Sequence, residues 1–192
     1  MRHLIAALIV VASSLIANAQ EENPSPDPAM QMYIEMARPV RGHERLRTLA
    51  GRWDMSLKFW MDPSQPPQAF RGTATGRMIL GGRFLQLEGR TTGEFESESL
   101  SILGFDRRTD DYTMVGYDTL GTYYITAAGK PAPGDGVVVL AGSYAQPPHG
   151  GEQKYRFVWK NRGPDSHTLE LYFVQPGGKE ALVAETVYRR AK

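Results

Sequence analysis

Two acidic triplets are the first feature of the sequence that could carry chemistry. Gly-aromatic-Asp occurs at 104–106 and again at 116–118, with two arginines, a threonine and two aspartates in between. A calcium loop needs oxygen ligands at alternate positions and a glycine near its centre. Arginines stand at those positions here, so the stretch predicts a hairpin with Asp106 in the turn. Asp118, one strand length further on and beside Tyr117, remains a candidate ligand-binding residue.

The histidines are too scattered to predict a metal site. His43, His149 and His167 show no metal-binding spacing. The chain has no cysteine, which excludes disulfides and thiolate ligands. His167 alternates in phase with Leu169, so its side chain would point inward from a strand or, as a strand-end residue, lie at a rim.

The chain lacks the Gly-x-Ser-x-Gly signature of a nucleophile elbow, so a serine hydrolase is not indicated. Glu88 is the acid that could instead serve in catalysis or binding. Glu88 lies in phase with Phe84 and Gln86. On an inward face it would be a buried carboxyl with a raised pKa, able to transfer a proton or hold a ligand. A shift of one residue in strand register would place it on the surface. Both placements stay open.

The first 19 residues have the anatomy of a secretory signal peptide, with a basic start, an apolar run at 4–11 and a small-residue cleavage site at 17–19. The run is shorter than the ~20 residues that cross a bilayer, so no membrane span is predicted. We expect cleavage near Ala19 and a periplasmic or secreted protein. Cleavage removes one of the 22 basic residues, Arg2, and leaves 21 basic against 21 acidic residues. That balance gives no support to a nucleic-acid partner.

The remaining chain predicts a leader and one domain. Residues 20–38 read as a Pro-rich flexible leader with a short helix at 30–37, and residues 39–192 as the domain, with a helix at 42–50. Hairpin-length connections predict an all-β, antiparallel up-and-down barrel of about ten strands, which leaves no free sheet edge. The expected strands are 53–61, 70–80, 83–91, 96–105, 112–118, 122–128, 136–144, 152–160, 167–174 and 180–189.

Alternation along these strands identifies the residues that would face the lumen. Small residues at 72, 74 and 76 would leave space inside a barrel. Polar groups of Glu88, Tyr117 and Asp118 would orient the head group of a ligand. The alternative is that the aromatic side chains fill the interior as an ordinary core. The expected apolar wall comprises Met55, Leu57, Phe59, Tyr155, Phe157 and Trp159.

Four segments, in order, resemble a bacterial family described as domain of unknown function 1579. They are GHERLRTLAGRWD (42–54), GTATGRMILGGRFLQLE (72–88), ILGFDRRTDDY (102–112) and GGKEALVAETVYRR (177–190). The resemblance runs from Met32 to Arg190. It implies a calycin-type barrel, related to lipocalins, fatty-acid-binding proteins and nitrobindins, and the family has no established activity.

The resemblance gives structural roles to three residues. Gly51 would let the chain turn out of the helix, and Trp53 would then enter the barrel floor. Arg190, in phase with Tyr188, would stack on the indole, whereas Arg189 would point to solvent. An inward His167 would be placed to ligate haem iron, as in nitrobindin-like proteins.

The function we expect is binding of a small apolar or amphipathic molecule in the lumen of an exported barrel, without a cofactor. Two alternatives remain. One is a small-molecule enzyme that uses acids or tyrosines of the lumen, and the other is a haem or nitric-oxide binder through His167.

Overall fold

A computed structural model describes residues 27–93, 96–132, 136–145 and 150–192. The predicted signal peptide and the start of the leader lie outside the described residues. The chain divides into two units, Met1–Glu35 and Met36–Lys192. Helix α1 (Pro28–Met36) buries none of its residues. Within the described ranges, no helix is long and apolar enough to cross a membrane.

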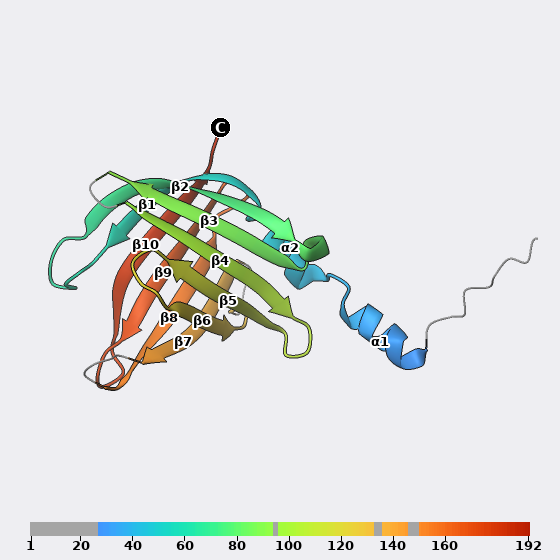
Figure 1. Cartoon of the computed structure of the whole chain (residues 1–192). Helices are drawn as coiled ribbons and strands as arrows, with labels where there is room; N and C mark the ends of the chain where they lie inside the picture. Colours follow the sequence, from blue (N-terminus) through green and yellow to red (C-terminus); the bar gives the residue numbers. More distant parts are fainter. Residues whose placement is uncertain (1–26, 94–95, 133–135, 146–149) are drawn as a thin grey trace, which may run out of the picture. The chain divides into compact units, whose positions relative to one another are not determined.

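The second unit contains ten antiparallel strands that close into a barrel (Figure 1). Each strand pairs with its neighbours in the sequence, and β1 pairs with β10 to complete the closure. Every boundary lies within two residues of the range predicted from alternation. The strands are β1 (Gly51–Phe59), β2 (Gln68–Ile79), β3 (Phe84–Thr92), β4 (Ser97–Asp106), β5 (Asp111–Asp118), β6 (Tyr124–Gly129), β7 (Val137–Ala145), β8 (Glu152–Asn161), β9 (Ser166–Val174) and β10 (Glu180–Arg190).

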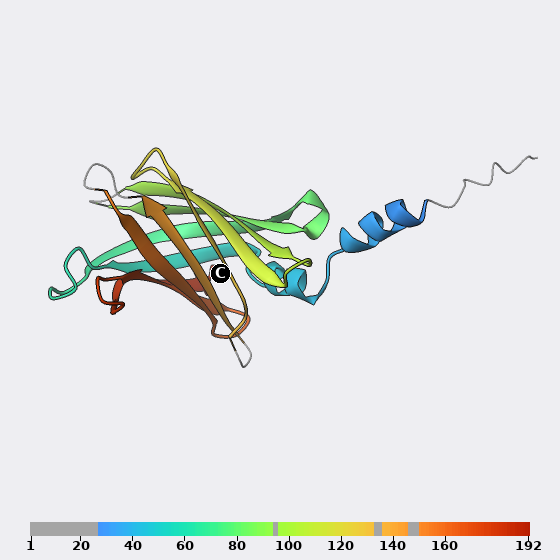
Figure 2. The ribbon, with the colours of Figure 1, turned by 90° about the horizontal axis from the view of Figure 1, so that it is seen from below.

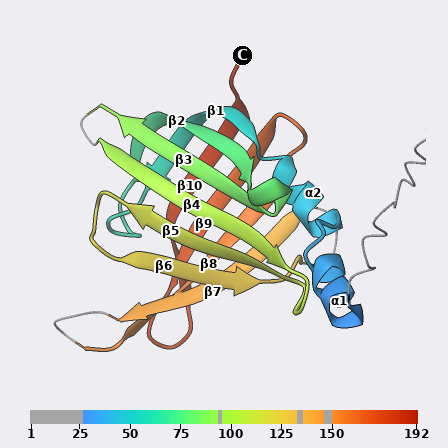
Figure 3. The same ribbon diagram turned by 45° about the vertical axis from the view of Figure 1, so that its right-hand side comes forward.

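Helix α2 (Arg41–Arg47) covers one end of the barrel, which we call the α2 end. The helix contacts β2, β3 and β4 (Figure 3). Leu46 and Leu49 are buried in the main core, and a 3-10 turn, η1 (Leu80–Gly82), joins β2 to β3 at the same end. His43 caps the helix, because its Nδ1 accepts a hydrogen bond of 3.0 Å from the backbone N–H of Val40. One end of the lumen is therefore plugged by apolar side chains.

The opposite end of the barrel, which we call the far end, carries the loops 60–67, 119–123 and 175–179 (Figure 2). No helix of the described residues of the second unit lies there. Loops of a strand meander alternate between the two ends, so Asp106 and Asp118 finish β4 and β5 at opposite ends. The side chain of Asp106 accepts a hydrogen bond of 2.8 Å from the backbone N–H of Arg108, which makes it the predicted turn former.

The interior has two contrasting walls. On β2 to β5 the inward positions nearer the far end are mostly small, whereas those nearer the α2 end include Leu85, Leu103 and Met114. The inward side chains of β8 and β9 are large and mostly aromatic. This asymmetry leaves space that a uniformly large set would fill. The small set is Gly72, Ala74, Gly76, Gly89, Ser97, Ser99, Ser101 and Gly116; the large set is Tyr155, Phe157, Trp159, Leu169, Leu171 and Phe173.

Strands β6 and β7 have the shortest pairing of any two neighbouring strands in the sheet. The register of this pairing consists of one residue pair within the two strands, Ala128 with Ala141. A side chain reinforces it, since the Tyr155 hydroxyl donates a hydrogen bond of 2.8 Å to the carbonyl oxygen of Thr126. A Cβ at Gly142 would lie 2.7 Å from the Tyr155 oxygen, so only glycine leaves room for this phenol.

Candidate functional site

Trp53 forms the floor of the lumen at the α2 end. It is 1% exposed, and its indole N–H donates a hydrogen bond of 2.9 Å to the carbonyl oxygen of Leu49. The guanidinium carbon of Arg190 lies 4.1 Å from the centre of the indole ring, and Arg189 is exposed. This geometry is the one that alternation in the last strand predicted, and it is a cation–π contact.

Arg190 also ties together three segments of backbone. Its Nη1 donates to the carbonyl oxygen of Ala50 at 3.1 Å, and its Nη2 donates to those of Thr48 and Pro164 at 3.2 and 3.1 Å. These carbonyls lie at the end of α2 and in the loop between β8 and β9. Gly51 makes the approach possible, because its φ is +121° and a Cβ there would lie 2.5 Å from Nη1.

His167 points into the lumen and not toward a rim. It is 3% exposed, and its ring stacks on Tyr188 with centroids 4.3 Å apart and an angle of 13°. The edge of Trp53 meets the same ring at 4.6 Å, and Trp159 lies at 6.1 Å. His167 is the second residue of β9 and pairs with Tyr188, so it lies near the strand end but is buried, and the interpretation that placed it at a rim is wrong.

The His167 imidazole is neutral and incompletely hydrogen-bonded. Burial, reinforced by the charge of Arg190, lowers its pKa from 6.5 to about 4. Its Nδ1 is buried and has no hydrogen-bond partner among the described residues. Beside it, burial raises the pKa of Tyr188 to about 12, so this phenol is neutral as well. A buried polar atom without a partner is uncommon and points to a missing interaction.

A cavity of about 50 Å³ lies next to His167 in the interior. Its wall is largely apolar, with two serine hydroxyls, the imidazole and one phenol as the polar groups. None of the lining side chains carries a carboxylate, an ammonium or a guanidinium. The lining residues are Leu49, Ala74, Leu87, Gly89, Ser99, Ser101, Leu103, Met114, Leu140, Trp159, His167, Leu169 and Tyr188.

The predicted lumen residues of β1 lie above this cavity, toward the far end. Met55, Leu57 and Phe59 follow Trp53 on the inward face, and all three are half-buried. Met55 approaches the cavity wall, because a Cβ at Gly89 would lie 3.6 Å from its terminal methyl group. Inward apolar side chains that keep part of their surface accessible indicate an interior that is not filled at this level.

The aromatic residues of β8 are packed more tightly than those of β1. Tyr155, Phe157 and Trp159 are 3%, 6% and 6% exposed and belong to the main core. Trp159 alone of these three lines the cavity. The expected apolar wall is thus divided: Tyr155 and Phe157 fill the interior, Trp159 borders the cavity, and the β1 residues are half-buried and do not line it.

Haem does not fit the cavity beside His167. Pockets for ligands of drug size measure ~300–1,000 Å³, far above the volume found here. Among the described residues there is also no group of three or more His, Asp or Glu that could hold a metal ion.

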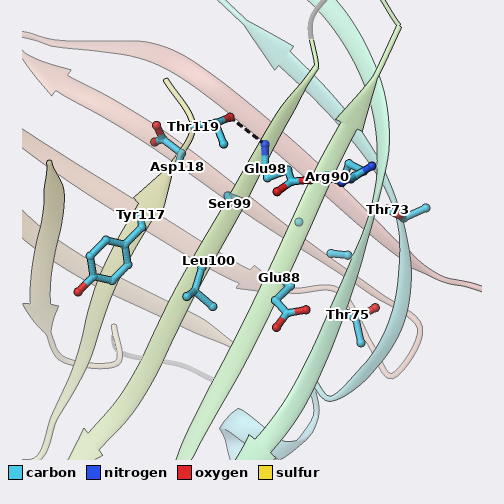
Figure 4. Close-up of a pocket in the computed structure, with 12 residues that line it drawn as sticks. Thr73, Thr75, Glu88, Arg90, Glu98, Ser99, Leu100, Tyr117, Asp118 and Thr119 are labelled. Atoms are coloured by element: carbon cyan, nitrogen blue, oxygen red, sulfur yellow. Dashed lines mark hydrogen bonds and ion pairs between the residues drawn. The ribbon is translucent and has the colours of Figure 1, made fainter. Parts of the chain in front are cut away.

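Glu88, Tyr117 and Asp118 come together on the outer surface and not in the lumen. They border a hollow of about 610 Å³ over β2 to β5 (Figure 4). The Glu88 carboxylate is 56% exposed and lies 3.5 Å from Nη2 of Arg77. Tyr117 is 48% exposed and packs against Tyr124. The expectation that these groups orient a head group inside the barrel is therefore wrong.

Strand register explains the misplacement of two of these residues. Ala74 pairs with Gly89 and both point inward, so Glu88 must point outward with its opposite residue Thr75. Tyr117 pairs with Leu100, whose parity is outward as well. Asp118 lies at the exposed strand end, where its carboxylate accepts a hydrogen bond of 2.9 Å from the backbone N–H of Leu120 and forms a turn.

Ser99, Ser101 and Tyr188 line the cavity but were not among the predicted site residues. The signal for the serines is present in the sequence: Ser97, Ser99 and Ser101 alternate with Glu98 and Leu100. Serines at three successive inward positions of one strand are unusual, because serine fills little volume in a core and places a polar hydroxyl there.

These features define a class: ten-stranded antiparallel barrels with one end plugged by a helix and a partly filled lumen. The chain belongs to the family "Protein of unknown function (DUF1579)", whose model matches residues 38–190.

A solved structure shares the fold. The crystal structure of Rv2717c from M. tuberculosis matches 81% of this chain and 100% of its own, with a TM-score of 0.59 and 15% sequence identity. An identity this low supports the fold alone. A comparison with curated proteins finds no match.

Proposed function

We propose that the protein binds a small apolar or amphipathic molecule in its lumen. The observation that carries the proposal is an incompletely filled interior: Met55, Leu57 and Phe59 are inward and half-buried, and a cavity lies beside His167. A packed core would leave neither feature, because interiors are normally filled to the density of organic crystals.

Burial of apolar surface would supply most of the affinity. Each buried CH₂ group of a ligand contributes roughly 0.8 kcal/mol. The small wall of β2 to β5 supplies the room, and the large residues of β8 and β9 supply a rigid apolar surface on the opposite side. The mechanism is sequestration from water, which needs no reacting group.

Native mass spectrometry of the protein purified from its source tests this proposal. We expect a co-purifying small molecule that is released by organic solvent. Leu57→Trp, which fills the lumen from β1, should abolish the adduct, whereas Ser56→Trp on the exposed outer face should retain it. A wild-type protein that neither carries a molecule nor binds apolar probes would contradict lumen binding. A haem adduct with a Soret band would replace the proposed ligand class.

We further propose that binding takes place after export, on the strength of the signal-peptide anatomy of residues 1–19. The mature chain should then begin at Gln20. Amino-terminal sequencing of the protein recovered from a periplasmic or culture fraction checks this, and an intact Met1 in that fraction would contradict it.

A further inference from the structure

A ring nitrogen of His167, beside the deep cavity, has no hydrogen-bond partner in the part of the chain that the structure describes. His167 is neutral at ordinary pH, and its Nδ1 is buried without a partner among the described residues. Its ring cannot turn freely to find one, because it is stacked on Tyr188 and faces the edge of Trp53. A buried polar atom without a partner destabilises the ligand-free protein, and a ligand that forms a hydrogen bond with this atom removes that destabilisation.

The cavity offers polar groups but no charge. The hydroxyls of Ser99 and Ser101 share its wall with the imidazole, and each can donate or accept. The nearest cation on the same side of the barrel, Arg190, is engaged by the Trp53 ring and by backbone carbonyls, and it does not line the cavity.

A carboxylate would be poorly accommodated in this place. Moving an ionised group out of water is costly unless an opposite charge or several donors receive it. The cavity has no cation, and in the tautomer with the proton on Nε2, on which the proposal below depends, the lone pair of Nδ1 repels an anion. A hydroxyl group has the reverse properties, since it is neutral and carries a proton to donate.

We propose that the lumen selects a neutral ligand with a hydroxyl group, an apolar alcohol, over a carboxylic acid of the same length. The hydroxyl donates to His167 beside Ser99 and Ser101, and the apolar part lies along Met55, Leu57 and Phe59 toward the far end. The cavity of about 50 Å³ receives the hydroxyl end only. This specificity rests on the proposed lumen binding and adds the ligand class.

Competition between decanol and decanoate at neutral pH tests the selection. An apolar fluorophore, N-phenylnaphthylamine, reports occupancy of the lumen in the mature full chain. We expect decanol to displace it at a concentration at least about tenfold lower than decanoate, in line with the cost of burying an unpaired carboxylate. His167→Phe keeps a ring for the stack on Tyr188 but removes the acceptor. This variant should weaken the binding of decanol by about fivefold, which corresponds to the loss of one hydrogen bond, and leave the binding of decanoate unchanged.

A measurement on the wild-type protein avoids any effect of the variant on folding. The ¹⁵N chemical shift of His167 Nδ1 should move on addition of decanol in the direction of a hydrogen-bonded acceptor, and decanoate should not move it. Equal displacement by the two ligands, or a preference for decanoate, would overturn the selection while leaving lumen binding in place. Failure of the fluorophore and both ligands to bind would instead overturn the proposed function.

Discussion

Arg190 joins the last strand to the segment that leads into the first strand. Its guanidinium covers Trp53 and donates to carbonyl oxygens of Thr48, Ala50 and Pro164. Arg190→Ala should lower the free energy of unfolding by about 2 kcal/mol, because a cation–π contact and charge-assisted hydrogen bonds are lost together. Urea denaturation measures the loss. Arg189→Ala, at the exposed neighbour, is the control and should change stability by less than ~0.5 kcal/mol.

Gly51 allows that contact, and its effect can be separated into backbone and side-chain parts. Gly51→Ala places a residue with a Cβ at φ +121° and 2.5 Å from Arg190. Gly163 has a similar φ of +113°, but nothing lies within 4 Å of its Cβ position. Gly163→Ala should therefore show the backbone cost alone, roughly 1–3 kcal/mol. Gly51→Ala should cost more in the same urea titration, and equal costs would show that Arg190 moves aside freely.

The burial of His167 makes the folded state sensitive to acid. The pKa of His167 is about 4 in the folded protein and 6.5 in an exposed chain. At pH values between these two, the imidazole binds a proton in the unfolded state but not in the folded state. Stability should fall as pH drops from about 6.5 to about 4, by at most about 3 kcal/mol, and this residue should add nothing further below that range. Trp53, Trp159 and Tyr188 surround the ring, and Arg190 supplies the charge.

Urea midpoints measured across this pH range for the wild type and for His167→Phe isolate the contribution of the imidazole. Acidic groups elsewhere affect both proteins alike. The variant should lose stability less steeply with acid, and identical slopes would mean that His167 accepts a proton in the fold.

Among the secondary-structure elements, β6 and β7 form the join where the barrel should open first. Their register has one residue pair, and the Tyr155 hydroxyl bridges β8 to the carbonyl oxygen of Thr126 on β6. Tyr155→Phe should lower the free energy of unfolding by about 1 kcal/mol, the value of one part-buried hydrogen bond. Hydrogen exchange should quicken in β6 and β7 and stay unchanged in β1 and β2, which pair over nine residues. Uniform quickening in all strands would contradict a local role.

The existence and bounds of the strands could be predicted from alternation, because a period of two and frequent turn residues are local properties. The face of each strand could not always be predicted. The inward direction of Trp53 and Tyr155 could be predicted because bulky apolar residues alternate in phase with them. Around Glu88, between Leu87 and Gly89, neither of the two alternating sets of residues is clearly apolar, so alternation does not identify the inward face. Its side was settled by pairing with β2, and such pairing is a relation between distant segments that periodicity does not record.

The closed architecture could be inferred from ten hairpin-linked strands, and the degree of filling could not. Volume inside a barrel depends on which large side chains meet which small ones across the lumen. The serines of β4 face the aromatic residues of β8 and β9 only after closure has set the register of all ten strands. The alternation of Ser99 and Ser101 is visible in the sequence, but their place beside His167 and Tyr188 depends on that closure.

The pairing of β1 with β10 has a consequence for the order of assembly. Strand β1 cannot find its second neighbour until the last residues of the chain have been synthesised, and the Arg190 contacts wait equally long. Contacts between the two ends of a chain are reached slowly, since a long loop must close before they form. The sheet therefore cannot close before the final strand is available, and pairing of that strand with β1 is the step that turns an open sheet into a closed barrel.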